Sequence, residues 1–401
     1  MRTITLHQPR RLVFGCGSIA ECISYFCEFS PTHLRILTSP SLKGAAAHIE
    51  NELSARTAVS IDTSISGEPT VDDCLAAIRA AEAAGATCIL GLGGGSVLDV
   101  AKLVAAFVRS EQQLQDTFGI GLLSSRSCHL VCMPTTSGTG SEVSPNAILL
   151  DESARLKKAV ISPHLVPDAA FIDPELTATV PASVTAATGL DALAHCLEAY
   201  TNKFAHPVVD TYALEGIALA GRFLLRAVQN PNDMEAREGM ALASLYGGLC
   251  LGPVNTAAGH ALAYPLGSEY HIPHGVTVAL VQPHVFRFNA EATPERHATV
   301  ATALGARPGG CDLETATAGA DFLARLTRDS GINPNLGSYG IRPAEIPSLA
   351  DSALKVERLI QNSPRLVTRK DCIDIYERCF EPQQPPLQHS VYMPNITKLI
   401  L

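Results

Sequence analysis

The stretch LGLGGGSVLDVAK, residues 90–102, places three consecutive glycines and a serine between an apolar run and a helical pattern. The run at residues 87–92 (TCILGL) predicts a buried strand. Glycines at such a turn let backbone N–H groups approach a phosphate, and the helix N-terminus adds a partial positive charge. The spacing is neither GxGxxG nor a Walker loop, because Ser96 stands where the last glycine would fall. The stretch therefore indicates either a pyrophosphate site or a plain tight turn.

A second polar turn, PTTSGTGSE at residues 134–142, follows another predicted strand at residues 129–133 (HLVCM). Its hydroxyls and glycines can hydrogen-bond the phosphate, ribose or nicotinamide amide of a cofactor, or they can form a Ser/Thr-capped loop. Two such turns after successive strands favour a ligand at the carboxyl ends of a parallel sheet.

The first 180 residues alternate β-rich runs, such as residues 34–38 (LRILT), with Ala-rich helical ones, such as residues 71–84. This alternation predicts a doubly wound α/β domain with parallel strands. After Pro181 apolar residues recur at helical spacing and β-rich runs become scarce. We therefore expect an α/β dinucleotide-binding domain at residues 1–180 and an all-helical domain at residues 181–401, with the boundary near PELTATVPAS.

Composition excludes several classes of protein. A net charge of −9 and a pI near 5.8, without any run of Lys and Arg, argue against a nucleic-acid partner. The apolar stretches are too short and too rich in Gly and Pro to span a membrane, and the N-terminus does not read as a signal peptide. The twelve cysteines lack CxxC spacing and several lie inside apolar runs, which predicts free thiols. We expect a cytoplasmic protein without a membrane partner.

Four residues form a candidate metal site. Asp191 and His195 are four positions apart in TGLDALAHCLEAY, so on a helix they share one face. They can hold one ion or only hydrogen-bond each other. His260 and His274 lie in GHALAYPLGSEYHIPHG, and with the first two they make an Asp/His3 set. Such a set suits Fe²⁺ or Zn²⁺ and is too rich in nitrogen for Mg²⁺ or Ca²⁺. A single histidine is more often a core or surface residue than a ligand, so the residues alone leave the question open.

Seven segments occur in the order typical of a known family. They are FGCGSI from Phe14, GGGSVLDVAK from Gly93, MPTTSGTGSEVSPNAIL from Met133, LKKAVISPHLVPDAAFIDPELT from Leu156, TGLDALAHCLEAYTN from Thr188, GHALAYPLGSEYHIPHG from Gly259 and NSPR from Asn362. In these segments the sequence resembles the iron-containing (group III) alcohol dehydrogenases. The resemblance implies a Rossmann-like α/β N-terminal domain and an all-helical C-terminal metal-binding domain, an architecture similar to that of dehydroquinate synthase.

The resemblance also implies functional residues. The metal-ligand positions of the family fall on Asp191, His195, His260 and His274. Its nucleotide-contact positions fall on Gly94, Gly95, Ser96, Thr135, Thr136, Thr139, Ser141, Lys158 and Leu176. By this resemblance a homodimeric enzyme transfers a hydride between NAD or NADP and a small alcohol, aldehyde, ketone or oxo-acid. The substrate oxygen is expected to bind Fe²⁺ or Zn²⁺, which acts as a Lewis acid.

Two positions depart from the family pattern. Many members carry a further histidine, thought to help in proton transfer, where this sequence has Tyr264. A phenol, with an ordinary pKa of about 10, carries protons less readily at neutral pH than imidazole does. We therefore expect Tyr264, His271 or water to relay the proton. Many NAD-dependent members place an aspartate on the ribose where this chain has Ser39, so NAD and NADP are both compatible.

Three other functions are weighed against this one. A maleylacetate reductase shares the architecture, but Asp191 and the TTSGTGSE turn favour an alcohol dehydrogenase. A lyase like dehydroquinate synthase needs many basic residues for its phosphorylated substrate, and residues 191–200 supply almost none. A protein that only binds ligands would leave the metal set and both cofactor turns without a role.

Overall fold

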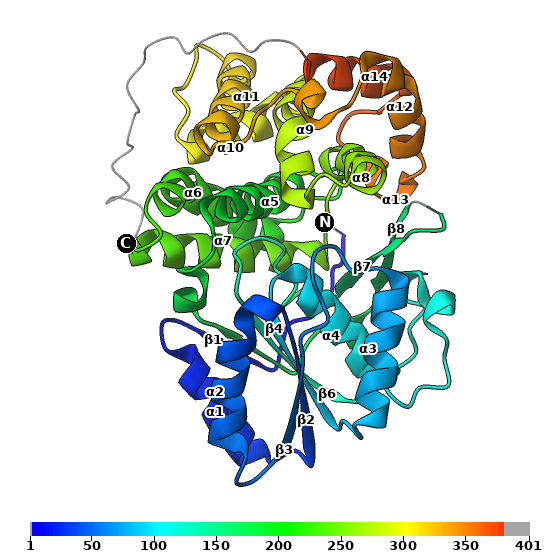
Figure 1. Ribbon diagram of the computed structural model, residues 1–401. Coiled ribbons are helices and arrows are strands. Elements are labelled where there is room, and N and C mark those ends of the chain that lie inside the picture. The colour runs from blue at the N-terminus through cyan, green and yellow to red at the C-terminus, as the bar shows by residue number, and fades with distance from the viewer. Residues whose placement is uncertain (1, 155, 381–401) are drawn as a thin grey trace. The chain divides into compact units, whose positions relative to one another are not determined.

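The computed structural model describes residues 2–154 and 156–380, which form two compact units (Figure 1). The unit that we name the α/β unit comprises Arg2–Pro181 and Pro231–Pro253. The helical unit comprises Ala182–Asn230 and the described residues 254–380. Residues 231–253 therefore group with the α/β unit, whereas the sequence pattern placed all residues after 180 in one helical domain. The functional boundary at residue 180 stays a prediction.

The α/β unit contains a six-stranded parallel sheet. Its strands, in spatial order, are β1 (Arg11–Phe14), β9 (Ala169–Ile172), β6 (His129–Pro134), β4 (Cys88–Gly93), β2 (His33–Thr38) and β3 (Ala58–Asp62). The strands predicted at residues 34–38, 87–92 and 129–133 are confirmed as β2, β4 and β6. Because β4 and β6 are neighbours in the sheet, the turns that follow them emerge at the same edge.

Helices cover both faces of this sheet (Figure 1). Side chains of α1 (Ser18–Phe29) and α2 (Lys43–Leu53) bury one face together with Leu90. Those of α3 (Val71–Ala83) and α4 (Gly95–Phe107) bury the other together with Ile89. Successive residues of a strand point to opposite faces, so a continuously apolar strand requires cover on both. The predicted doubly wound fold and the helix expected at residues 71–84 are confirmed.

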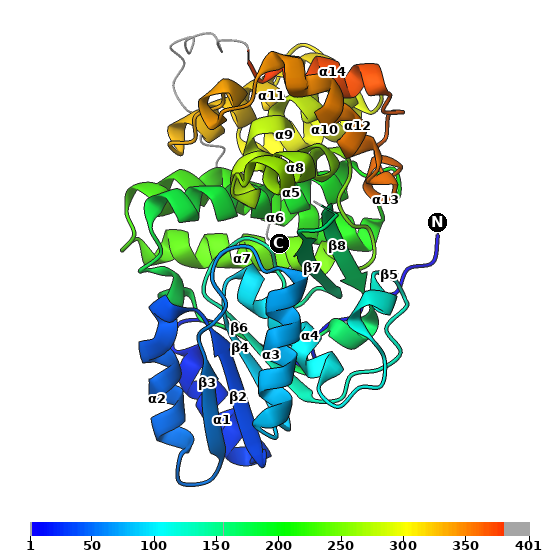
Figure 2. The same ribbon diagram turned by 45° about the vertical axis from the view of Figure 1, so that its right-hand side comes forward.

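The α/β unit also contains a smaller sheet that the sequence did not predict, with one strand before the second turn and two after it in the chain (Figure 2). It contains β5 (Gly119–Ile120), β8 (Leu156–Ile161) and β7 (Asn146–Asp151) in that spatial order, with β7 and β8 antiparallel. Helix α7 (Met234–Leu251) packs against the loop before β7: a Cβ added at Gly248 would overlap Gly140 O and lie 2.7 Å from Gly140 Cα. This close approach explains why residues 231–253 group with the α/β unit.

The helical unit is formed by α5 (Ala182–Thr201), α6 (Pro207–Gln229), α8 (Ala258–Tyr270), α9 (His274–Ala290), α10 (Pro294–Leu304), α11 (Asp312–Asp329), α12 (Ile346–Leu354), α13 (Glu357–Ile360) and α14 (Arg369–Arg378). Helix α5 packs against α6 and α9, and α8 packs against α9. The described part of this unit contains no strand, which confirms the all-helical prediction. Among the residues that the structure describes, no helix is both long and apolar enough to cross a membrane.

Candidate functional site

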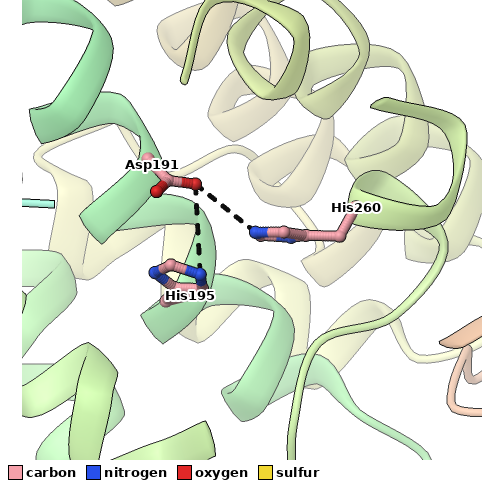
Figure 3. Close-up of side chains that lie close together, drawn as sticks. All are labelled: Asp191, His195 and His260. Carbon is pink, nitrogen blue, oxygen red and sulfur yellow. Dashed lines mark ion pairs between the residues drawn. The ribbon is translucent and has the colours of Figure 1, made fainter. Parts of the chain in front are cut away.

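The four predicted metal ligands come together in the helical unit. Asp191 and His195 lie one turn apart on α5, His260 lies in the first turn of α8, and His274 opens α9. Asp191 Oδ1 is 4.0 Å from His195 Nε2, 3.4 Å from His260 Nε2 and 3.6 Å from His274 Nε2. Figure 3 shows the imidazoles of His195 and His260 on the side of that oxygen. Three imidazole nitrogens from three helices thus surround one carboxylate oxygen.

This arrangement fits a divalent cation. Oxygen and nitrogen ligands bound at 2.0–2.2 Å around a tetrahedral ion lie about 3.3–3.6 Å apart. The ligand atoms of Asp191, His195 and His260 all lie within 4.8 Å of one another, and His274, which is outside that group, has its Nε2 3.6 Å from Asp191 Oδ1. Asp191 Oδ1 and His260 Nε2 are buried, and neither has a hydrogen-bond partner among the described residues. Unpartnered polar atoms are costly in a protein interior, and coordination to a metal would satisfy both.

Charge in the cluster points to the same chemistry. Burial acts to raise the pKa of Asp191, but the imidazoles of His195, His274 and His260 outweigh it and hold this pKa well below its ordinary range. Burial acts to lower the pKa of His260, but the Glu198 and Asp191 carboxylates raise it to about 10. The buried carboxylates therefore need positive charge beside them, which protons on the imidazoles or a divalent cation can supply.

Close packing of the helices places these side chains. A Cβ added at Gly275, the second residue of α9, would overlap the carbonyl oxygen of Ala187 on α5. A glycine is therefore needed directly after His274, because it lets the start of α9 approach α5. The spacing of the histidines in the sequence does not reveal this contact.

Sequence reasoning missed Glu198, which is buried on the same face of α5 as Asp191. Its Oε2 is 3.1 Å from His260 Nδ1. The signal was the spacing, since residues 191, 195 and 198 are at positions i, i+4 and i+7 of one helix and therefore share a face.

The two predicted proton-relay residues lie in different surroundings. Tyr264 is buried on α8, its ring centroid is 5.8 Å from that of His274, and its hydroxyl accepts a hydrogen bond from Arg358 Nη2 at 3.4 Å. His271 is exposed at the C-cap of α8, with a φ of 55°. The His271 N–H donates to Gly267 O at 3.0 Å, and no hydrogen bond found among the described residues joins His271 to the four clustered side chains.

The predicted cofactor turns lie against each other in the α/β unit. A Cβ added at Gly94 would be 3.2 Å from Thr136 Oγ1, and one at Gly95 would be 2.5 Å from Thr139 Cγ2. The Thr135 N–H donates to Gly93 O at 3.0 Å. Helix α4 starts without a side-chain cap, so its first N–H groups are available to an anion. The two turns therefore form one polar surface at the carboxyl edge of the sheet.

The remaining predicted cofactor residues are more dispersed. Ser96 lies in the first turn of α4, Ser39 follows β2 with its hydroxyl 2.9 Å from that of Ser41, and Leu176 follows β9. Lys158 lies on β8, where it forms an ion pair with Asp151 at 2.7 Å. Ser141 is buried and its hydroxyl donates to Asp99 at 2.5 Å, so this side chain supports the loop.

A buried polar network beneath the turns was not predicted. Lys102 is fully buried, and its Nζ donates to Ser144 O at 2.9 Å and to Asn146 O at 2.8 Å. Burial lowers the pKa of Lys102, and it raises the pKa of Glu142 to about 7. The lysine therefore ties α4 to the loop that carries the second turn.

Comparison with known proteins identifies relatives of the whole chain. The family described as iron-containing alcohol dehydrogenase matches residues 9–174, and the Fe-containing alcohol dehydrogenase family, C-terminal, matches residues 185–380. Sulfoacetaldehyde reductase of Bilophila wadsworthia (strain 3_1_6) is 33% identical over 381 residues, which cover 93% of this chain and 98% of the relative.

Solved structures are similar over almost the whole chain. A 1,3-propanediol oxidoreductase has a TM-score of 0.90 at 30% identity and covers 94% of this chain and 100% of its own. Sulfoacetaldehyde reductase from Bifidobacterium kashiwanohense in complex with NAD⁺ has a TM-score of 0.85 at 26% identity, with coverages of 94% and 99%. The likeness therefore includes both units.

Proposed function

The chain belongs to the iron-containing alcohol dehydrogenase family, and from this premise we propose that it transfers a hydride between a nicotinamide cofactor and a small alcohol or aldehyde. The observation that carries the proposal is the convergence of three imidazole nitrogens on Asp191 Oδ1. In this proposal Asp191, His195, His260 and His274 hold one Fe²⁺ or Zn²⁺. A bound divalent ion supplies Lewis-acid stabilisation of the negative charge that develops on the substrate oxygen.

The protein contributes the placement of these groups. Burial of Asp191 and His260 removes competing water and strengthens their electrostatic interactions with a cation. His274 is the most exposed of the four, with 26% of its side chain accessible, and therefore marks the side from which a substrate would approach. Tyr264 packs against His274 and is the residue that we propose relays the alcohol proton.

The polar surface at Gly94, Gly95 and Thr139 is the proposed cofactor site. Uncapped N–H groups at the start of α4 suit a pyrophosphate, and the hydroxyls of the second turn suit ribose or the nicotinamide amide. The NAD⁺ complex of a relative supports NAD. Ser39 brings no carboxylate to repel a 2′-phosphate, so NADP is also compatible with this chain.

Names of relatives suggest the range of substrates. Two of these names refer to sulfoacetaldehyde and 1,3-propanediol, both short molecules with a second polar group, while another relative, 34% identical, is named a long-chain-alcohol dehydrogenase. For this chain we propose a small aldehyde whose size is similar to that of sulfoacetaldehyde.

We also propose that the enzyme is a homodimer located in the cytoplasm. Light scattering coupled to size exclusion measures the oligomeric state, and a monomer would contradict that part of the proposal. Cell fractionation measures the location.

The decisive experiment is a coenzyme assay. We expect metal-free protein to be inactive, and protein reloaded with Fe²⁺ or Zn²⁺ to oxidise NADH or NADPH with at least one member of a panel of short aldehydes and oxo-acids. His260→Ala, which removes one ligand, should lose bound metal by elemental analysis and at least 10³-fold in kcat/KM. Full activity of the variant without metal would contradict the proposal, and preference for maleylacetate over every aldehyde would reassign the substrate.

A further inference from the structure

Glu198 makes more contacts with the start of α8 than an ordinary buried carboxylate needs. Its Oε1 accepts the His260 N–H at 3.1 Å, and its Oε2 accepts the Ala257 N–H. The same Oε2 is 3.1 Å from His260 Nδ1. One carboxylate therefore binds both the backbone and the ring of His260.

These contacts replace a local helix cap. Ala257 is the N-cap residue of α8 and has no side chain that can accept a hydrogen bond, so the first N–H groups need acceptors from elsewhere. Glu198 supplies them from α5, and Ser363 Oγ supplies one more by accepting the Ala258 N–H at 3.2 Å. Asn362, in the NSPR segment, donates to Thr256 O at 2.7 Å. A distant segment and α5 thus fix the backbone from which His260 projects.

Gln282 on α9 lies at the same place. A Cβ added at Gly259 would overlap both Glu198 Oε1 and Gln282 Oε1, so these two oxygens are neighbours. The Gln282 side chain is buried, and neither its oxygen nor its nitrogen has a hydrogen-bond partner among the described residues. Exchanging the amide oxygen and nitrogen, which have nearly the same shape, would present an N–H donor to the carboxylate.

We infer that Glu198 and Gln282 are positioning residues of the metal centre: the amide of Gln282 donates to the Glu198 carboxylate, which receives His260 Nδ1–H and turns His260 Nε2 toward Asp191. The inference rests on the proposed function. A proton fixed on Nδ1 leaves the lone pair on Nε2, which lies 3.4 Å from Asp191 Oδ1. A carboxylate partner also makes the imidazole a stronger donor to a cation. Gly259 is required because any side chain there would displace the carboxylate and the amide.

Glu198→Gln tests the role of the charge. Glutamine keeps an oxygen that can accept the Ala257 N–H, but it removes the carboxylate from His260. We expect the affinity for Zn²⁺, measured by competition with a chromophoric chelator, to fall 10- to 100-fold. The metal-free variant should stay folded but with a lower urea midpoint, because the glutamine amide can accept only one of the two backbone N–H groups that the carboxylate accepts. Gln282→Leu removes the amide that we propose donates to the Glu198 carboxylate. It should lower the Zn²⁺ affinity less than Glu198→Gln does, by about 3- to 10-fold.

A matched control is available on the same helix. Thr201 is buried on α5, and within the described part of the chain its hydroxyl donates to Leu197 O in the preceding turn and to no other group. Thr201→Val should keep the Zn²⁺ affinity within twofold of the wild type. If the wild type binds Zn²⁺ and Glu198→Gln binds it equally well, the positioning role is wrong while the proposed function stands. If the wild type itself holds no Zn²⁺, the proposed function fails and this inference fails with it.

Discussion

At the scale of single residues, the two candidate proton-relay residues, Tyr264 and His271, differ in where the fold places them. Both occur within the segment that carries His260 and His274, and both side chains can transfer a proton. The helix buries Tyr264 beside His274 and leaves His271 exposed at its C-cap. Because a proton relay has to reach the reacting oxygen directly or through one water, Tyr264 is the better candidate.

We expect Tyr264→Phe to lower kcat by about 10²-fold, because the variant keeps the packed ring and loses only the hydroxyl. His271→Ala should stay within twofold of the wild type. Steady-state kinetics on the preferred aldehyde provide the measurement, and bound metal should be the same in both variants. A larger loss for His271→Ala than for Tyr264→Phe would assign the relay to the histidine.

At the scale of elements, the contact between α7 and the second turn is the least expected feature. Gly140 has a φ of +60° and lies against Gly248, so both glycines are required, one for its backbone conformation and both for the close approach. Lys102 Nζ donates to the carbonyl oxygen of Asn146, the first residue of β7, which follows this turn. The predicted cofactor surface is therefore supported from α4 and from α7.

Gly248→Ala should disturb this support, because the added Cβ would overlap Gly140 O and push the turn away from α7. We expect about 1–3 kcal/mol less stability and weaker NADH binding, both measurable by urea unfolding and fluorescence titration. Gly252→Ala is the control, since its Cβ would lie 3.4 Å from Pro145 Cγ, an ordinary contact. Equal NADH affinity in the two variants would show that the turn does not depend on α7.

At the scale of the whole molecule, the buried carboxyl group of Glu142 makes the stability of the fold depend on pH. Glu142 is 2% exposed, and burial raises its pKa from 4.5 to about 7, although Lys102 opposes the shift. Between pH 4.5 and about 7 the folded chain therefore holds a proton at Glu142 that the unfolded chain releases. Folding is favoured by this group at low pH, and the contribution is lost as the pH rises through 7.

Glu142→Gln should remove this dependence, because an amide does not ionise. The unfolding free energy of the variant minus that of the wild type should be larger at pH 8 than at pH 5, by about 1–3 kcal/mol. Urea unfolding at the two pH values measures the difference. Glu52→Gln, at an exposed position of α2, should show none. Parallel pH profiles for Glu142→Gln and the wild type would contradict the assignment.

Features that depend on residues close together in the sequence were predicted, and features that depend on contacts between distant residues were not. Strands β2, β4 and β6 and helix α3 were predictable because apolar periodicity and the glycine-rich turn are local signals. The hairpin of β7 and β8 and the grouping of α7 with the α/β unit were not, because they depend on contacts between distant residues such as Gly140 and Gly248. Asp191 and His195 share a helix face by spacing alone, whereas adding His260 and His274 needed the family resemblance.

The amino-acid sequence alone determined the fold class through local periodicity, and it determined the family and the set of candidate ligands through the resemblance of its motifs to a known family. Only the tertiary structure decided that Asp191 Oδ1 faces three imidazoles, that Glu198 and Gln282 stand behind His260, and that Ser141 supports its loop. The physical reason is that side-chain orientation in a packed interior is set by neighbours from other helices and strands. The spacing of residues along the chain does not reveal which of these distant neighbours pack together.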